Sequence, residues 1–119
     1  MMENKALSFI EDGLKKSIKF NTWINCPQYH LTVYIRLTKR LIDKQICDTI
    51  DLASVSVDEK FWHKGYFKKL LNNLEELAKI YHRTIYIESI LNEYVMQYGL
   101  KTGYSLTPNN ISINLYRKF

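Results

Sequence analysis

Glycine, proline and cysteine are scarce in this chain, and each shortage excludes a class of protein. Four glycines and two prolines in 119 residues exclude collagen-like and low-complexity chains, and they leave no place for a long flexible linker. The two cysteines, Cys26 and Cys47, form neither a metal-binding pair nor a dense disulfide framework. His30 and His82 show no metal-ligand spacing either. We therefore expect no metal site and a reducing compartment.

Long hydrophobic runs are also missing. No apolar run approaches the ~18 residues of a membrane span, and the start Met-Met-Glu-Asn-Lys lacks the pattern of a signal segment. With 46% hydrophobic and 24% charged residues, the chain has the composition of a soluble globular protein. We expect one cytoplasmic domain spanning residues 1–119, with no membrane partner. The abundance of lysine, asparagine and isoleucine hints at an AT-rich genome, which is compatible with a phage source and hence a host cytoplasm.

Basic residues outnumber acidic ones. The 17 Lys+Arg against 12 Asp+Glu give a formal net charge of +5. This balance favours anionic partners such as phosphates, nucleic acid or acidic surfaces, without choosing among them.

Hydrophobic periodicity predicts helices that alternate with strands. Leu7, Ile10, Leu14 and Ile18 fall at helical spacing and predict a helix over residues 5–20. The other predicted elements are a connector at 23–27 (irregular or briefly extended), a half-buried strand at 31–38, a turn at 42–45, an extended stretch at 46–57, a helix at 67–81, a strand at 84–88, a helix at 91–102 and a closing hairpin of 104–106 with 111–115. Gly103 fits a helix C-cap. This order predicts an α/β fold, with a mixed, partly antiparallel sheet flanked by helices on both faces.

The extended stretch changes phase. Its apolar residues stand at even positions up to Leu52 and at odd positions from Ala53 to Val57. A strand changes phase where a residue is inserted or where both faces are buried. We predict a β-bulge near residues 52–54, and a fully buried central strand is the alternative.

Gly65 stands between the extended stretch and the strongest predicted helix. The first N–H groups of a helix lack internal partners and attract anions, and glycine permits a positive φ there. His63, Lys64 and Lys68 would surround a phosphate bound at this place. The alternative is that Gly65 only shapes a turn and that the lysines are solvated.

Two segments together resemble the GNAT superfamily of N-acetyltransferases. Residues 62–67, preceded by 55–57 and followed by Leu70 and Leu71, resemble the R/Q-x-x-G-x-G/A signature whose amides hold the coenzyme A pyrophosphate. Residues 87–92, with Gly103 and Tyr104 after the next helix, resemble the second coenzyme-binding segment of the family. The similarity extends to small phage-encoded members, and the family carries a bulge in the corresponding strand.

The resemblance implies a GNAT-like fold over residues 29–119, acetyl-CoA as cofactor and direct acetyl transfer to a primary amine of a protein or small molecule. The implied cofactor-binding residues are Val55, Ser56, Val57, His63, Lys64, Gly65, Tyr66, Phe67, Lys68 and Asn92. The candidate catalytic groups are the carboxylates of Glu88, Asp58 and Asp51 as bases, the N–H of Val57 as oxyanion donor, and the hydroxyl of Tyr98 or Tyr94 as acid. Packing in the core is the alternative role for Tyr98, and a solvated strand end is the alternative for Glu88 and Asp58.

Three positions depart from the family pattern. Trp62 replaces Arg or Gln, Phe67 replaces a small residue, and Gly99 stands where the family often has its acidic tyrosine. These departures favour an alternative function, a GNAT-like binding or inhibitory module without catalysis, such as a phage protein directed against its host. A nucleic-acid binder or base modifier is a third reading that only the net charge supports. The chain is expected to be a monomer, or a homodimer paired through its closing strands.

Overall fold

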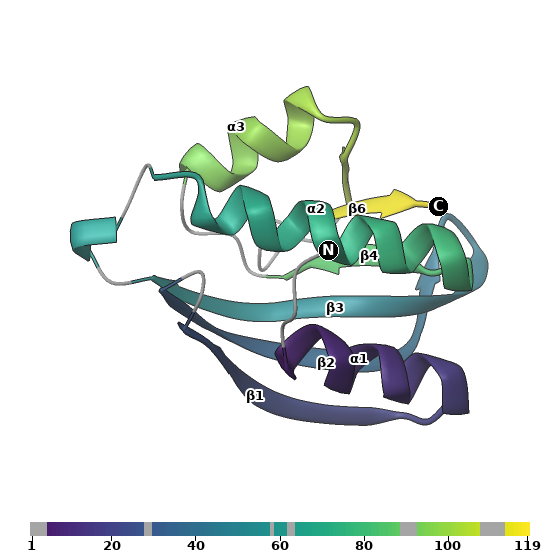
Figure 1. Ribbon diagram of the computed structural model, residues 1–119. Helices are drawn as coiled ribbons and strands as arrows, with labels where there is room; N and C mark the ends of the chain where they lie inside the picture. Colours follow the sequence, from purple (N-terminus) through teal and green to yellow (C-terminus); the bar gives the residue numbers. More distant parts are fainter. Residues whose placement is uncertain (1–4, 28–29, 58, 62–63, 89–92, 108–113) are drawn as a thin grey trace.

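The computed structural model describes residues 5–27, 30–57, 59–61, 64–88, 93–107 and 114–119. Its helices are α1 (Lys5–Lys16), α2 (Tyr66–Tyr81) and α3 (Glu93–Lys101). Its strands are β1 (Phe20–Cys26), β2 (Leu31–Ile42), β3 (Gln45–Val57), β4 (Thr84–Ile87), β5 (Ser105–Leu106) and β6 (Leu115–Lys118). The α/β class that the sequence predicts is therefore confirmed (Figure 1).

The strands form one mixed sheet in the order β1-β2-β3-β4-β6-β5. Neighbouring strands are antiparallel except β3 and β4, which are parallel and joined through α2. β6 lies between β4 and β5, so the chain skips one position and returns to fill it (Figure 1). Parallel neighbours need a crossover, and the single helical crossover from β3 to β4 supplies it.

Strand β1 was missed in the sequence, where residues 23–27 are predicted as a connector. The strand pairs with β2 along its whole length, from Phe20 opposite Leu37 to Cys26 opposite Leu31. Ile24 and Cys26 are buried, whereas Trp23 and Asn25, which alternate with them, are exposed. The alternation of buried and exposed residues covers only a few positions, and the polar residues of β1 make it hard to recognise in the sequence.

A two-residue turn joins β2 to β3, as the sequence predicts. Asp43 and Lys44 have φ angles of 51° and 65°. Two successive left-handed residues make the type I′ turn, whose twist matches that of the adjoining strands. The turn fixes the register, so that Ile42 faces Gln45 and each earlier residue of β2 has a defined partner on β3.

The helices cover one face of the sheet, and the prediction of helices on both faces is wrong for the described residues. Helix α1 contacts α2, where the Tyr81 hydroxyl donates to Glu11 Oε2 at 3.2 Å. Helix α3 meets the first turn of α2, with Lys68 Nζ 5.7 Å from the centre of the Tyr98 ring. All three helices contribute to one hydrophobic core, whose sheet residues share one face. Among the described residues no helix covers the opposite face, which we call the open face.

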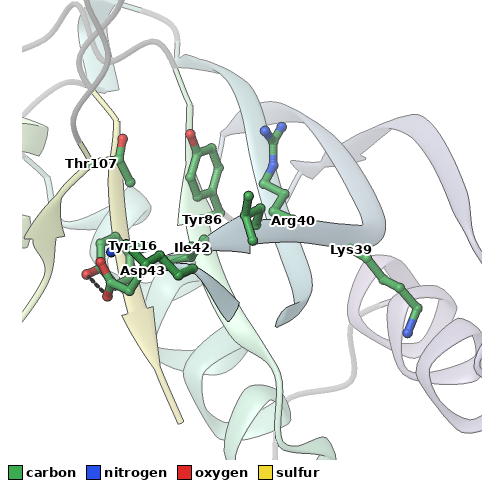
Figure 2. A pocket seen from close by; sticks show the side chains of 9 residues that line it. Lys39, Arg40, Ile42, Asp43, Tyr86, Thr107 and Tyr116 are labelled. Atoms are coloured by element: carbon green, nitrogen blue, oxygen red, sulfur yellow. Dashed lines mark hydrogen bonds between the residues drawn. The ribbon is translucent and has the colours of Figure 1, made fainter. Parts of the chain in front are cut away.

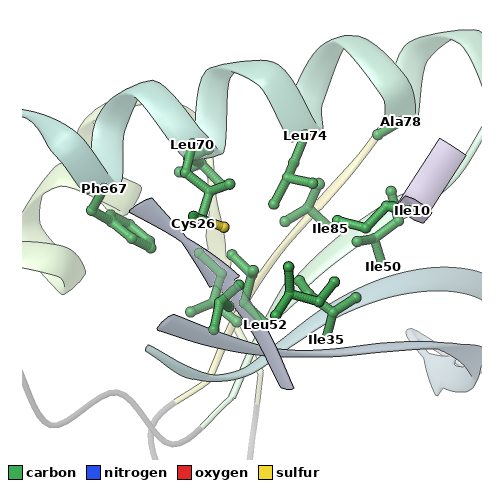
Figure 3. Packing of buried hydrophobic residues seen from close by; sticks show 14 of the residues in the cluster. Ile10, Cys26, Ile35, Ile50, Leu52, Phe67, Leu70, Leu74, Ala78 and Ile85 are labelled. Atoms are coloured by element: carbon green, nitrogen blue, oxygen red, sulfur yellow. The ribbon is translucent and has the colours of Figure 1, made fainter. Parts of the chain in front are cut away.

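The core lies between the sheet and α2. Leu70, Leu71, Leu74 and Ala78 recur at helical spacing on α2 and are fully buried. They pack on Ile35, Ile50, Leu52 and Ile85 of three adjacent strands and on Ile10 of α1 (Figure 3). Alternate residues of these strands therefore point at the helices, and the residues between them form the open face.

Each helix ends at a residue in the left-handed region. Ser17, His82 and Gly103 have φ angles of 52°, 55° and 97°. After each of them an N–H returns to the last turn, as in the 2.9 Å bond from Tyr104 N to Gly99 O. The predicted cap at Gly103 is confirmed, whereas α1 ends at Lys16 rather than near residue 20 because Ser17 turns the chain into β1.

Tyr104 ties the end of α3 to α2 and provides a test of the packing. Its buried hydroxyl donates to Glu75 Oε2 at 2.7 Å. Burial raises the pKa of Tyr104 most, and the hydrogen bond to Glu75 raises it further. We expect Tyr104→Phe to lower the free energy of unfolding by about 1.5–3 kcal/mol, because a buried hydrogen bond to a charged group is lost. Urea unfolding at neutral pH measures this, and a loss below about 0.5 kcal/mol would contradict the assignment.

No helix in the described part of the chain is long and apolar enough to cross a membrane.

Candidate functional site

A β-bulge interrupts β3 where the sequence predicts it. Tyr34 pairs with Ser54 and Ile35 pairs with Leu52, so Ala53 between them has no partner on β2. Ser54 and Ser56 are exposed and Val55 is half-buried. The bulge is therefore confirmed. The strand is also buried on both faces from Thr49 to Leu52, but this burial ends at the bulge and does not account for the phase change beyond it. The extra residue moves Val55 onto the face that the helices cover.

The pairing of β3 with β4 ends at the bulge, and we call this point the strand separation. Their parallel pairing runs from Thr49 opposite Thr84 to Leu52 opposite Ile87, and it ends with the bond from Glu88 N to Leu52 O at 2.9 Å. Beyond this point β3 continues to Val57, and no described residue pairs with it from the β4 side. Within the described residues, the backbone of residues 53–57 therefore has an unpaired edge on the β4 side, with groups that seek hydrogen bonds.

Helix α2, the next helix of the α type after β3, begins with an uncapped N-terminus. Gly65 has a φ of 81°, and a Cβ atom there would meet nothing within 4 Å, so the backbone conformation rather than space favours glycine. No side chain caps the helix, and its first bond runs from Lys69 N to Gly65 O at 3.0 Å. The N–H groups of Tyr66, Phe67 and Lys68 therefore have no acceptor within the helix. They form the positive end of the helix dipole.

The surroundings of this N-terminus are basic. Lys64 and Lys68 are exposed, and the first turn of α2 contains no acidic residue. Tyr66 makes edge contacts with His30 and Phe61, whose rings stack at 3.8 Å. The structure thus brings together the predicted residues Lys64, Gly65 and Lys68 in an arrangement that favours an anion.

Phe67, which departs from the family pattern, points away from the N–H groups. Its side chain is buried and packs into the core beside Leu70 (Figure 3). A large residue at this position therefore leaves the amides uncovered.

A network of ion pairs lies on the open face, at the point where β3 and β4 separate. Glu88 accepts from Arg36 Nη1 at 3.0 Å and from Arg40 Nη2 at 3.3 Å. Arg40 Nε also donates to Asp51 Oδ2 at 2.8 Å, and its guanidinium lies 4.2 Å from the centre of the Tyr86 ring. Two of the predicted carboxylates, Glu88 and Asp51, are thus held by the same arginine.

The two carboxylates differ in exposure. The Asp51 side chain is fully buried, and its Oδ1 has no hydrogen-bond partner among the described residues. The Glu88 side chain is 25% exposed. A base must be reached by its substrate, so Glu88 is the better placed of the two for proton transfer.

Asp51 makes stability depend on pH. Burial raises the pKa of its carboxyl above the ordinary value of 3.8, against the opposing effects of Thr49 and Arg40. An acid whose pKa is higher in the folded state adds stability that is complete below the unfolded value and is lost as the pH rises through the folded value. We expect the stability of the wild type relative to Asp51→Asn to be largest below pH 3.8 and to fall as the pH increases. Urea unfolding from about pH 3 to 8 measures this difference, and a constant difference would contradict the expectation.

The tyrosine position of the family pattern has no room for a side chain. A Cβ on Gly99 would lie 2.5 Å from Cδ1 of Leu115, which is fully buried in β6. Tyr98 beside it is half-buried and packs against the core, with Lys68 over its ring. Helix α3 therefore needs glycine here in order to approach β6.

The other predicted site residues are only partly placed. Val55, Ser56 and Val57 lie in β3 beyond the bulge, and Val57 pairs with Leu31 of β2. Tyr94 lies in α3. Asp58, His63 and Asn92, like Trp62, lie outside the described residues.

Arg36 and Arg40 were missed in the sequence, although a signal was present. They stand four residues apart in β2, so both side chains project from one face. The predicted turn at 42–45 already sets Arg36 opposite Asp51. Extending this register along the hairpin places Arg36 and Arg40 on the same face as Asp51 from the sequence alone.

Metal chemistry and comparisons add no further residues to the site. In the described part of the chain, no group of three or more His, Cys, Asp or Glu side chains is arranged to hold a metal. Cys26 is a free thiol, and burial raises its pKa. No protein-family model matches the chain, and no curated protein matches it either.

Proposed function

We propose that the protein is a coenzyme A-dependent N-acetyltransferase with a GNAT-like fold. The observation that carries the proposal is the end of the β3–β4 pairing at a bulge, together with the uncapped N-terminus of α2, the helix that follows β3. An extended chain can add to the free edge of β3, while an anion binds the helix N-terminus. A long ligand with amide groups and a pyrophosphate, such as coenzyme A, combines these two features.

The residues present fit this ligand. The N–H groups of residues 66–68 would hold the pyrophosphate, and Lys64 and Lys68 would neutralise it. The edge of β3 at Val57 would bind an amide of the pantetheine arm. Phe67 is buried in the core and leaves this path open. Bound acetyl-CoA supplies an acetyl group activated as a thioester.

Each catalytic task has a proposed residue. Glu88, held by two arginines at the strand separation, takes the proton that an ammonium must lose before it attacks. The N–H of Val55 is the proposed donor to the carbonyl oxygen on which negative charge develops, because the expected donor Val57 lies five residues beyond Leu52, where Glu88 is held. Tyr98 is the proposed acid, although a thiolate, with a pKa of about 8.5, can also leave unassisted. Because no tyrosine side chain fits at position 99, the proposal includes departure of the thiolate without an acid.

An acetyl-transfer assay tests the proposal. Purified protein is incubated with acetyl-CoA and a panel of primary amines and protein lysine acceptors, and free thiol and acetylated product are measured together. We expect product and thiol in equal amounts, both dependent on the acceptor. Thiol and product at the level of a protein-free control, for every acceptor, would contradict an acetyltransferase.

The packing at Gly99 favours a second candidate function, a GNAT-like module that binds coenzyme A without turnover. Saturable binding of acetyl-CoA with no product in the assay above would support this candidate. Partner capture would then replace the search for an acceptor.

A further inference from the structure

A hollow on the open face lies between the β2–β3 turn and the strands β5 and β6. Its volume is about 710 Å³, within the range of small-molecule sites (Figure 2). The lining residues are Lys39, Arg40, Leu41, Ile42, Asp43, Lys44, Tyr86, Thr107 and Tyr116. Arg40 joins the hollow to the ion-pair network, because the same guanidinium contacts Glu88.

The floor of the hollow is aromatic and apolar. Tyr86 and Tyr116 are cross-strand partners, and Ile42 at the end of β2 is buried. The acid of the hollow, Asp43, is already engaged, since it accepts from the Tyr116 hydroxyl at 2.6 Å and lies 3.8 Å from Lys118 Nζ. The floor therefore offers a surface for a large apolar group.

Polar groups gather at one end of this floor. Figure 2 shows the Arg40 guanidinium, the Tyr86 hydroxyl and the Thr107 hydroxyl pointing toward the same end. Thr107 Oγ1 is buried and has no hydrogen-bond partner among the described residues. An unpartnered buried hydroxyl is costly, and a ligand group would satisfy it.

Arg40 and Glu88 have hydrogen-bonding capacity to spare. A guanidinium has about five N–H donors and a carboxylate about four acceptor positions. Arg40 donates to Asp51 and Glu88, and Glu88 accepts from Arg36 and Arg40, so each keeps capacity for a ligand. Both side chains are about one-quarter exposed, at 26% and 25%. A cation and an anion thus stand side by side, 3.3 Å apart, and the cation, Arg40, lines the hollow.

We propose that this hollow binds the acyl acceptor and that the acceptor is an α-amino acid with a large apolar or aromatic side chain. Its carboxylate binds Arg40, its ammonium faces Glu88, and its side chain lies over Tyr86, Tyr116 and Ile42. The zwitterion of an amino acid complements an adjacent Arg–Glu pair, because its two charges are held at similarly short range. Lys44 on the rim disfavours cationic side chains. The inference rests on the proposed acetyl transfer.

The chemistry balances with acetyl-CoA as the co-reactant. The ammonium gives one proton to Glu88, and the free amine forms the new N–C bond to the acetyl carbon. The C–S bond breaks, and its electron pair leaves with the sulfur. The second proton of the former ammonium goes to the departing thiolate, so the products are an N-acetyl amino acid and the free thiol.

Calorimetric titration without acetyl-CoA tests the inference. The probes are L-phenylalanine, phenethylamine, which lacks the carboxylate, and 3-phenylpropionate, which lacks the amine. We expect L-phenylalanine to bind at least about tenfold more tightly than either analogue, because each analogue loses one charge contact. Equal affinities for the three probes would overturn the inference. So would the absence of L-phenylalanine binding at concentrations 10 to 100 times about 1 mM, the upper end of typical KM values.

Two variants locate the binding. Thr107→Trp fills the hollow from its edge, without touching the ion pairs, and should remove the binding of L-phenylalanine. Lys101→Trp adds the same bulk at an exposed position of α3 and should leave it unchanged. Equal affinity of the two variants would overturn the placement.

The same protein is titrated with acetyl-CoA to separate the two proposals. Binding and turnover of acetyl-CoA without affinity for L-phenylalanine would overturn the acceptor and leave the proposed function intact. Affinity for L-phenylalanine without acetyl-CoA binding would support the hollow as an amino-acid site and count against the acetyltransferase.

Discussion

Gly65→Asp should lower the affinity for acetyl-CoA by about 100-fold or more. The change places a carboxylate at the N-terminus of α2, where the N–H groups of residues 66–68 have no acceptor within the helix. Two like charges about 4 Å apart near a protein surface repel by about 4 kcal/mol, and 1.4 kcal/mol already corresponds to tenfold in affinity. Calorimetric titration of both proteins with acetyl-CoA gives the ratio directly.

Gly65→Asn is the matched control for this charge. Asparagine and aspartate have nearly the same shape, and both tolerate the left-handed conformation that Gly65 adopts. A Cβ at this position meets no neighbour within 4 Å. We expect the asparagine variant to bind acetyl-CoA within about fivefold of the wild type. Equal losses in the two variants would mean that glycine acts through the backbone and that no phosphate lies there.

Glu88→Gln should lower the turnover of acetyl-CoA by about 10²- to 10⁴-fold, because a general base is removed. Glutamine keeps the length and one acceptor oxygen, so Arg36 and Arg40 retain a partner at this position. The N–H of residue 88 still bonds to Leu52 O, so the end of β4 is preserved. The affinity for acetyl-CoA should remain unchanged, since the carboxylate lies on the open face rather than at the start of α2.

Glu76→Gln is the control for the loss of an acid. Its side chain is 70% exposed on α2 and pairs with Lys79 on the surface, and it has no part in the proposed site. We expect wild-type turnover from this variant. If Glu88→Gln retained more than about half of the wild-type rate, the base would have to be sought elsewhere.

Much of the fold was predictable because local signals specify it. The type I′ turn at 43–44 and the apolar stripe of α2 follow from short stretches of sequence. The phase change at Ala53 located the bulge, since one inserted residue moves all later side chains to the other face. Strand β1 and the one-sided placement of the helices were not predictable in this way. Both depend on pairing and packing between distant segments, which no window of sequence contains.

The candidate site also combines features that local sequence predicts with features that depend on distant segments. Gly65 was predictable, because glycine adopts this left-handed backbone conformation more readily than any other residue and because it stands between a predicted strand and a predicted helix. The ion-pair network needed the register of β2 with β3, and the hollow needed the order of β4, β6 and β5. Residues such as Tyr86, Thr107 and Tyr116 acquire a common role only when the sheet brings them together.

A backbone amide titration tests the central claim most directly, namely that the separation of β3 from β4 and the start of α2 hold coenzyme A. The amide signals of ¹⁵N-labelled protein are followed as acetyl-CoA is added. The account predicts saturable shifts that are largest at the amides of Val55 and Val57 on β3 and of Tyr66, Phe67 and Lys68 on α2. The amide signals of β1 should not shift. Saturation without shifts at these five amides, or no saturable shift at millimolar acetyl-CoA (roughly the upper limit of ordinary substrate concentrations), would contradict it.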